Sequence, residues 1–146
     1  MLVEKLNLIT IAVVEDDIDL LANTIDYLKS DGFDAWGCTS AESFYKVFAV
    51  RDTHIIILDI GLPGESGLSM VEHLRHLPGL VLIIVSARAA IEDRIVGMNA
   101  GADRYLVKPV NFKELVANIE AAARSLPIVQ KENFIESSEK NNVMTN

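Results

Sequence analysis

The sequence contains a single cysteine, Cys38, and it has neither a long uninterrupted apolar segment nor an excess of basic residues. One cysteine cannot form a disulfide within the chain, so we expect a reducing, cytoplasmic location with Cys38 as a small buried apolar side chain. Charged residues or glycines interrupt every apolar stretch before it reaches the about 20 residues of a membrane-spanning helix. The N-terminal residues do not follow the pattern of a secretory signal. We therefore expect no contact with a membrane.

The net charge of −8 argues against direct binding of nucleic acid, because phosphate contacts need clustered Lys and Arg side chains. An acidic domain can instead hold a cation or dock on other proteins. The chain has 146 residues, of which 50% are hydrophobic and 23% charged, and this predicts one globular domain.

Short apolar segments alternate with helical patterns along the chain. Segments 8–14, 53–58, 80–85 and 105–107 are rich in β-branched residues and predict strands, and 33–38 predicts a weaker strand at an edge. The apolar residues run continuously rather than in alternation, which indicates strands buried on both faces of a parallel sheet.

Five helical patterns lie after these strands. Asp17, Ser40 and Asn111 stand where three of the helices should begin, and Gly101 stands where the fourth should end. The fourth helix carries one apolar stripe, formed by Ile91, Ile95 and Met98. The alternation predicts a doubly wound α/β fold with five parallel strands and five helices. We expect the strand order 2-1-3-4-5, partly by analogy with flavodoxin-like folds, a domain over residues 1–126, and a tail or linker over 127–146.

Polar side chains stand where the predicted strands end. Glu15 and Asp16 follow the first strand, Asp59 the third, Ser86 the fourth and Lys108 the fifth. The carboxyl ends of parallel strands share one edge of a sheet, so these side chains should converge there. Three carboxylates in one place repel each other unless a cation binds, and an all-oxygen site suits Mg²⁺. The charges of the three carboxylates, Mg²⁺ and Lys108 sum to zero. The alternative to a metal site is that these acids are solvated residues of the surface.

Four segments carry a resemblance to a known family: 13–17 (VVEDD), 57–64 (ILDIGLPG), 85–88 (VSAR) and 101–109 (GADRYLVKP). Together and in this order they resemble the signature segments of bacterial receiver domains from two-component response regulators, over about residues 7–125. The resemblance implies that Asp59 accepts a phosphoryl group. It also implies that Asp16, Asp59 and the Gly61 carbonyl hold Mg²⁺, with Glu15 binding closely or through water.

The resemblance assigns further roles around the acceptor. Lys108 would pair with the phosphoryl oxygens, and a cis peptide bond before Pro109 would aim it inward. Ser86 would donate a hydrogen bond to the phosphoryl group. Tyr105 would be the aromatic residue that turns inward in the switch, the alternative being a partly buried strand tyrosine.

The family implies a phospho-switch rather than an enzyme, since the domain catalyses only its own phosphorylation and dephosphorylation. A sensor histidine kinase would be the donor. Phosphorylation would change the face formed by the fourth helix, fifth strand and fifth helix, allow a homodimer, and regulate transcription through a winged-helix DNA-binding domain outside this chain. A stand-alone receiver that acts through protein contacts is the alternative.

Several residues depart from the family's common pattern or stand where the family varies. Gly61 and Arg88 occupy positions that tune phosphate lifetime, and Val110 stands where Phe often follows Lys-Pro. Arg104 and Asn118 stand where many winged-helix regulators carry an acid and an arginine, so the salt-bridged dimer of those regulators is in doubt here.

Two other classes are less consistent with the first strand. A Mg²⁺-dependent phosphatase that forms an aspartyl phosphate would place its nucleophile there in an Asp-x-Asp pattern and would need a cap domain. A flavodoxin-like protein that binds FMN would need a phosphate loop of Ser, Thr and Gly there. The sequence instead has three consecutive acids, 15–17.

Overall fold

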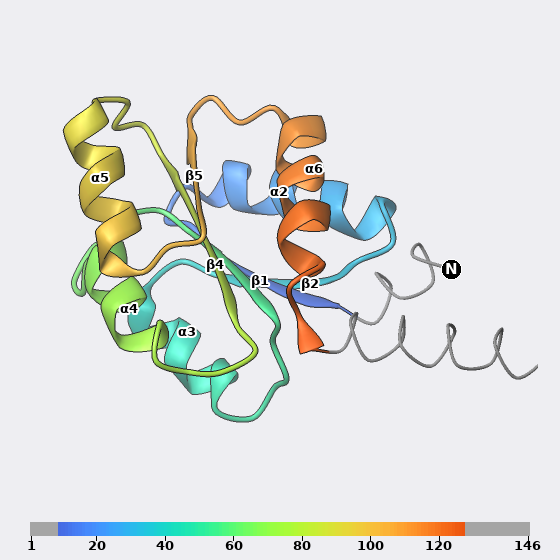
Figure 1. Cartoon of the computed structure of the whole chain (residues 1–146). Helices are drawn as coiled ribbons and strands as arrows, with labels where there is room; N and C mark the ends of the chain where they lie inside the picture. The colour runs from blue at the N-terminus through green and yellow to red at the C-terminus, as the bar shows by residue number, and fades with distance from the viewer. Residues whose placement is uncertain (1–8, 128–146) are drawn as a thin grey trace, which may run out of the picture.

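The computed structural model describes residues 9–127 as one parallel five-stranded sheet with helices on both faces (Figure 1). The strand order is β2-β1-β3-β4-β5, which confirms the order expected from the sequence. The strands are β1 (Thr10–Val14), β2 (Asp34–Cys38), β3 (Ile55–Leu58), β4 (Val81–Ser86) and β5 (Arg104–Val107). The helices are α2 (Ile18–Ser30), α3 (Ala41–Phe48), α4 (Gly67–Leu74), α5 (Ile91–Ala100) and α6 (Phe112–Ala123).

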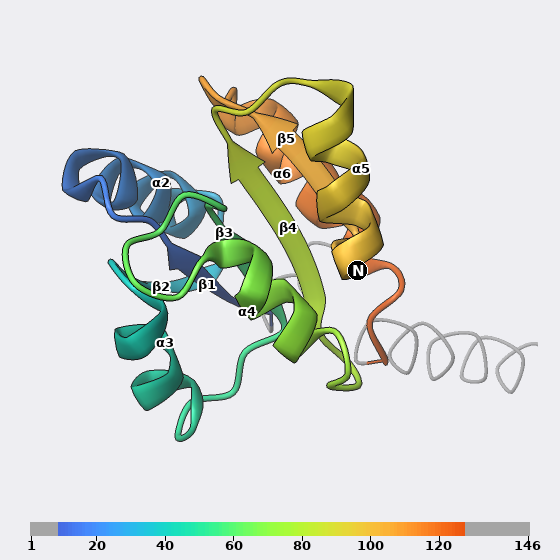
Figure 2. The same cartoon turned by 90° about the vertical axis from the view of Figure 1, so that its left-hand side faces the viewer.

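The two faces of the sheet bury two separate cores. Helices α2 and α6 cover one face, and α3, α4 and α5 cover the other, as Figures 1 and 2 show from two directions. All four residues of the central strand β3 are at most 3% exposed. Neighbouring residues of a strand point to opposite faces, so a strand covered on both sides must be apolar throughout. Burial of each such side chain contributes about 1.5–3 kcal/mol.

Short polar side chains begin most of the helices. Asp17, Ser40, Ser66 and Asn111 each accept a hydrogen bond from a backbone N–H in the first turn of the helix that follows. Three of these positions were expected from the sequence. The N-terminus of α5 differs, because Ala90 offers no side-chain acceptor.

The sequence and the structure differ in a few places. The described strands begin and end within two residues of the expected bounds, and Ser86 is the last residue of β4 rather than the first residue after it. The apolar stripe of α5 is exposed, and the helix buries Gly97 and Ala100 instead. Apart from Pro127, the expected tail lies outside the described residues. Within residues 9–127 no helix is long and apolar enough to cross a bilayer.

Cys38, His54 and His73 lie in different surroundings. Cys38 is buried at the end of β2, as expected, and burial raises the pKa of its thiol to about 11. His54 accepts a hydrogen bond from the backbone N–H of Thr10 at 3.0 Å. His73 Nδ1 lies 3.0 Å from Glu65 Oε1.

Candidate functional site

The strand register brings the expected polar residues to one edge of the sheet. Val14 pairs with Leu58, so Glu15 and Asp59 leave their strands at the same level. The Asp59 N–H donates to the Val14 carbonyl at 3.2 Å, which continues the ladder by one residue. On the other side of β4, the Lys108 N–H donates to the Ser86 carbonyl at 2.8 Å.

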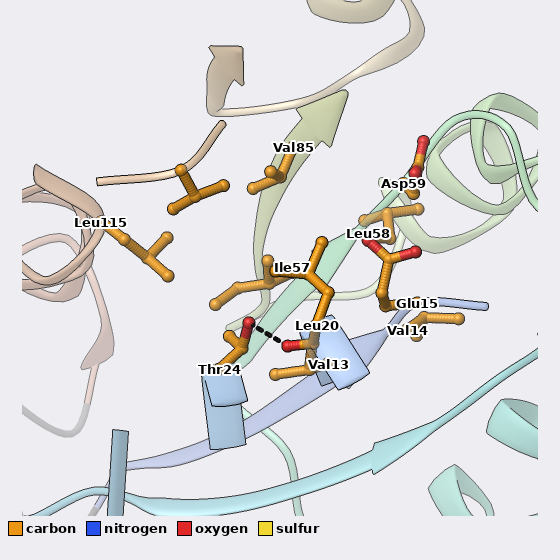
Figure 3. A pocket seen from close by; sticks show the side chains of 11 residues that line it. Val13, Val14, Glu15, Leu20, Thr24, Ile57, Leu58, Asp59, Val85 and Leu115 are labelled. Carbon is orange, nitrogen blue, oxygen red and sulfur yellow. Dashed lines mark hydrogen bonds between the residues drawn. The ribbon is translucent and has the colours of Figure 1, made fainter. Parts of the chain in front are cut away.

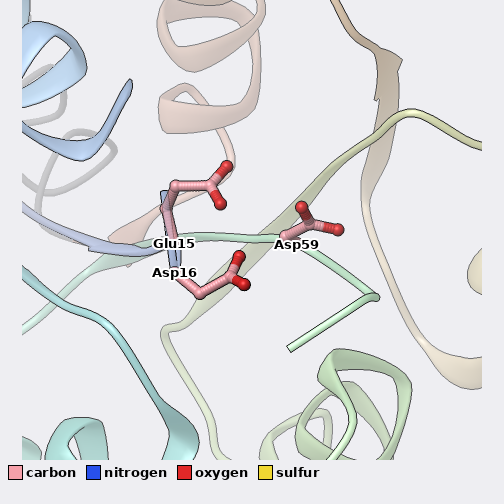
Figure 4. A group of neighbouring side chains, drawn as sticks. All are labelled: Glu15, Asp16 and Asp59. Atoms are coloured by element: carbon pink, nitrogen blue, oxygen red, sulfur yellow. The ribbon is translucent and has the colours of Figure 1, made fainter. Parts of the chain in front are cut away.

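Three carboxylates face one another at this edge. Glu15, Asp16 and Asp59 each offer an oxygen, and these oxygens all lie within 4.8 Å of one another (Figure 4). Glu15 is buried, Asp59 is half-buried and Asp16 is exposed, so the group opens to solvent on the Asp16 side. Carboxylate oxygens are the ligands that hard divalent cations prefer. Mg²⁺ in particular keeps several of its water ligands when only a few carboxylates bind it. The residues expected to bind Mg²⁺ therefore suit this ion. The Gly61 backbone lies beside them, since its N–H donates to Asp59 Oδ1 at 2.9 Å.

Lys108 lies between two of the three carboxylates. Its Nζ is 2.5 Å from Glu15 Oε1 and 2.6 Å from Asp59 Oδ2. The peptide bond between Lys108 and Pro109 is cis, as the resemblance implied. Burial lowers the pKa of Lys108, but the hydrogen bonds to Asp59 and Glu15 outweigh burial and leave that pKa raised. Lys108 is therefore a charged donor at neutral pH.

Glu15 has an unfavourable environment for a charge. Desolvation raises its pKa, and the hydrogen bonds from Lys108 and from the Asp17 backbone N–H only partly oppose this effect. Three carboxylates with one ammonium group leave two negative charges in excess. The site thus favours a further cation.

A small cavity lies beneath the carboxylates, between the sheet and helices α2 and α6 (Figure 3). Its volume is about 20 Å³, which is room for about one water molecule. Glu15 and Asp59 are at one side of it, and Val110 and Leu115 line it from the segment after β5. The Thr24 hydroxyl, also in the lining, donates to the Leu20 carbonyl at 2.7 Å. Val110, which stands where Phe often follows Lys-Pro in the family, is thus a wall of this cavity.

Ser86 and Tyr105 are connected through the loop that precedes α5. The backbone N–H of Arg88 donates to Ser86 Oγ at 3.1 Å, and the hydroxyl of Tyr105 donates to the Arg88 carbonyl at 2.7 Å. Tyr105 is only 6% exposed, so its ring lies inward. Gly97 permits this position, because a Cβ there would lie 3.0 Å from the tyrosine ring. The sequence predicts both side chains but not the part played by the Arg88 carbonyl, because every residue type carries a backbone carbonyl.

Comparisons with known proteins agree with this geometry. A family model described as "Response regulator receiver domain" matches residues 11–120. Transcriptional regulatory protein PrrA of Mycobacterium leprae is 39% identical over 116 residues, which cover 78% of this chain and 49% of that protein. Sensory transduction protein RegX3 of Mycobacterium bovis is 34% identical over 115 residues, covering 79% and 51%. The chain thus spans about half the length of these curated relatives.

Solved structures support the fold. A CheY-like response regulator receiver domain protein from Methanospirillum hungatei superposes with a TM-score of 0.71 at 27% identity. The match covers 90% of this chain and 98% of that one.

Proposed function

Because this chain belongs to the response regulator receiver domain family, we propose that it is a phospho-switch whose acceptor is Asp59. The donor is a phosphohistidine on a sensor histidine kinase. The observation that carries the proposal is the meeting of Asp59 with two further carboxylates and the Lys108 ammonium group at one edge of the sheet. Asp59 is the one acid of the three that follows the central strand β3, and like Glu15 it touches Lys108.

The transfer requires little of the protein beyond position and charge. One Asp59 carboxylate oxygen forms a bond to phosphorus while the bond from phosphorus to the histidine nitrogen breaks, and the electron pair leaves on that nitrogen. Glu15, Asp16, Asp59 and the Gly61 carbonyl would hold Mg²⁺, which would offset the negative charge of the carboxylates and the phosphoryl group. Lys108 donates hydrogen bonds to the phosphoryl oxygens.

The response passes to the α5–β5–α6 face through Ser86 and Tyr105. Ser86 turns toward the phosphoryl group to donate its hydroxyl hydrogen, and this movement shifts the Arg88 N–H, which donates to Ser86 Oγ. Tyr105 is bound to the carbonyl of the same residue, so a loop movement there reaches the ring and α5. We propose that this change regulates transcription through a DNA-binding domain beyond these 146 residues, because curated relatives of about twice the length include a transcriptional regulatory protein.

The proposal predicts that acetyl phosphate with Mg²⁺ adds one phosphoryl group, on Asp59. Intact-mass spectrometry and peptide mapping measure the adduct, which should be labile to hydroxylamine and absent when Mg²⁺ is chelated. Asp59→Asn removes the nucleophilic oxygen but keeps the shape, so labelling should vanish while the fold survives. Labelling of Asp59→Asn at the wild-type rate on Asp16 or Asp17 would contradict the assignment.

Lys108→Ala serves as the companion variant. Labelling should persist, because Mg²⁺ still offsets much of the charge. The shift of the α5–β5 amide NMR signals on phosphorylation should become smaller, because the ammonium group no longer ties the phosphoryl group to β5.

A further inference from the structure

The acceptor loop, residues 59–66, joins β3 to α4 and is attached to the rest of the molecule in several ways. The Ile60 carbonyl accepts a hydrogen bond from the Gly67 N–H at 3.2 Å, where the helix begins. Leu62 is buried and packs into the core on the α3 and α4 side of the sheet. Glu65 supplies a polar attachment, and it is not a member of the acid cluster described above.

One carboxylate oxygen of Glu65 receives contacts from two helices. The Ser69 hydroxyl of α4 donates to Oε1 at 3.1 Å, and His73 Nδ1 of the same helix lies 3.0 Å from that atom. The Tyr45 hydroxyl of α3 donates to it at 3.5 Å, the longest of the three contacts. The Glu65 side chain is only 30% exposed, so these groups replace much of the water that a free carboxylate would bind.

Tyr45 connects the loop to α3, which lies on the same face of the sheet as α4 (Figure 2). Its ring packs edge-on against Phe44, with 5.4 Å between ring centres. Burial, followed by the charge of Glu65, raises the pKa of Tyr45, so the hydroxyl keeps the proton that it donates. Among residues 9–127 no other hydrogen bond joins α3 to the acceptor loop or to α4. Without Glu65 these parts would touch through apolar packing alone.

The first turn of α4 transmits the position of Glu65 to the acceptor. Ser66 caps the helix, since its Oγ accepts from the Ser69 N–H at 3.1 Å, and Ser69 is the residue whose hydroxyl binds Glu65. Gly67 follows the cap, and a Cβ there would lie 1.9 Å from the Asp59 carbonyl oxygen. A shift of this turn toward the sheet therefore displaces the backbone of Asp59.

Gly61 is the expected metal ligand that depends most on the loop. A side chain can rotate to reach an ion, but a peptide group is planar, so a backbone carbonyl points where the loop directs it. The Gly61 N–H also donates to Asp59 Oδ1 at 2.9 Å. The path of the loop therefore affects both the carbonyl and the acceptor side chain.

We propose that Glu65 is a positioning residue for the phosphoryl transfer. It fastens the acceptor loop to α3 and α4, and it thereby holds the Gly61 carbonyl and the Asp59 carboxylate in the arrangement that suits Mg²⁺. The inference rests on the proposed function, because it requires Asp59 to be the acceptor and Mg²⁺ to be bound beside it.

The first test compares two substitutions of Glu65 by calorimetric titration of the whole chain with Mg²⁺. Glu65→Ala removes all three contacts and should weaken Mg²⁺ binding about three- to tenfold, the range that one lost hydrogen bond produces. Glu65→Gln removes the charge but keeps an oxygen to which Tyr45 and Ser69 can donate, so the loss should stay within about twofold. Glu72→Ala, at an exposed position of α4, removes an equal charge and should also stay within about twofold.

The link to α3 is tested by Tyr45→Phe, which removes one hydroxyl and keeps the ring. It should weaken Mg²⁺ binding about two- to threefold, and it should add nothing to Glu65→Ala in the double variant, because both changes remove the same hydrogen bond. The control is Tyr27→Phe on α2, whose ring stacks on Phe112, and it should leave the affinity unchanged. Additive losses in the double variant would overturn the inference.

The loop can also be observed without the ion, by NMR in EDTA. The Gly61 amide proton should exchange with solvent at least about threefold faster in Glu65→Ala than in wild type, because its hydrogen bond to Asp59 depends on the loop. The amide of Ile57, inside β3, should exchange at an unchanged rate. Faster exchange of both amides would indicate a general loss of stability and would overturn the inference.

Equal weakening of Mg²⁺ binding by Glu65→Ala and Glu65→Gln, or no weakening by either, also overturns the inference. Labelling of Asp59 by acetyl phosphate is measured on the same proteins. Glu65→Ala should label more slowly than wild type at low Mg²⁺ and should approach the wild-type rate at saturating Mg²⁺. If wild type is labelled on Asp59 and Glu65→Ala behaves like it at every Mg²⁺ concentration, only the inference is lost. If wild type is not labelled, the proposed function is lost instead.

Discussion

Glu15 is the residue at which folding and metal binding oppose each other most directly. Its side chain is almost fully buried, and desolvation raises its pKa although Lys108 lies 2.5 Å away. Lys108 is shared with Asp59, so one positive charge serves two carboxylates. Without a cation the buried charge of Glu15 destabilises the fold, and under the proposed function the same charge would be a metal ligand.

Glu15→Gln should therefore raise the free energy of unfolding by on the order of 1 kcal/mol at pH 7 in the presence of EDTA. The same variant should bind Mg²⁺ more weakly than wild type, whose affinity should be sub-millimolar to millimolar because few protein ligands hold the ion. Urea denaturation and calorimetric titration measure the two effects. Equal Mg²⁺ affinity of the two proteins would remove Glu15 from the metal site.

The pH dependence of that difference has a definite sign. A carboxyl group with a raised folded pKa favours the folded state at low pH, and this contribution is lost as pH rises through the folded value. The stability advantage of Glu15→Gln in EDTA should accordingly shrink between pH 7 and about pH 5, as the wild-type carboxyl takes up a proton. An advantage that grows on acidification would show that desolvation is not the cause.

The N-terminus of α4 lies close to the backbone of Asp59, which follows β3. Gly67 is buried at the first turn of α4, and a Cβ there would lie 1.9 Å from the Asp59 carbonyl oxygen. A side chain at this position would displace either the helix or the backbone of the acceptor. Glycine therefore sets the distance between α4 and the site.

Gly67→Ala should destabilise the protein by about 1–3 kcal/mol, as overpacking does elsewhere, and should slow phosphorylation by acetyl phosphate. The matched control is Gly61→Ala in the loop that precedes α4, where the nearest atom to a new Cβ is Asp59 Oδ1 at 3.6 Å. That control should change the free energy of unfolding by no more than about 0.5 kcal/mol. Equal losses in both variants would mean that loop flexibility, not the close approach, is responsible.

The sequence was sufficient to predict the helices and strands and the edge of the sheet at which the site lies. Consecutive apolar residues such as those of β3 indicate a strand that is covered on both faces of the sheet. The residue after each strand then lies at the carboxyl edge of the parallel sheet. Asp59 and Lys108 could therefore be brought together without coordinates.

The same reasoning could not determine which surfaces stay uncovered. Helical spacing shows that Ile91, Ile95 and Met98 share a face, but it does not show whether another element packs there. The contact between Glu65 and His73 was also out of reach. Glu65 and His73 are eight residues apart across a loop and a helix, and only the loop path brings them to 3.0 Å.

At the scale of the whole molecule, we expect weak self-association. The protein should remain mainly monomeric at micromolar concentration, and beryllium fluoride with Mg²⁺ should strengthen association little, because Arg104 and Asn118 remove opposite charges from the α5–β5–α6 face. Sedimentation velocity with and without beryllium fluoride measures this. A tight dimer that charge changes on α6 abolish would show that these two substitutions matter less than inferred.

The packing around Trp36 has a practical consequence for all of these measurements. This residue is the only tryptophan of the chain; it is 7% exposed on the edge strand β2 and stacks on Phe44 with 5.7 Å between ring centres. Its indole N–H finds no acceptor among the described residues, and the guanidinium group of Arg51 lies over the ring, 5.7 Å from its centroid. Lys108 and Tyr105 belong to the opposite edge of the sheet. Intrinsic fluorescence should therefore shift to the red on unfolding but stay constant when Mg²⁺ or beryllium fluoride binds. Trp36 can thus report the stability of the protein without responding to the binding of either ligand.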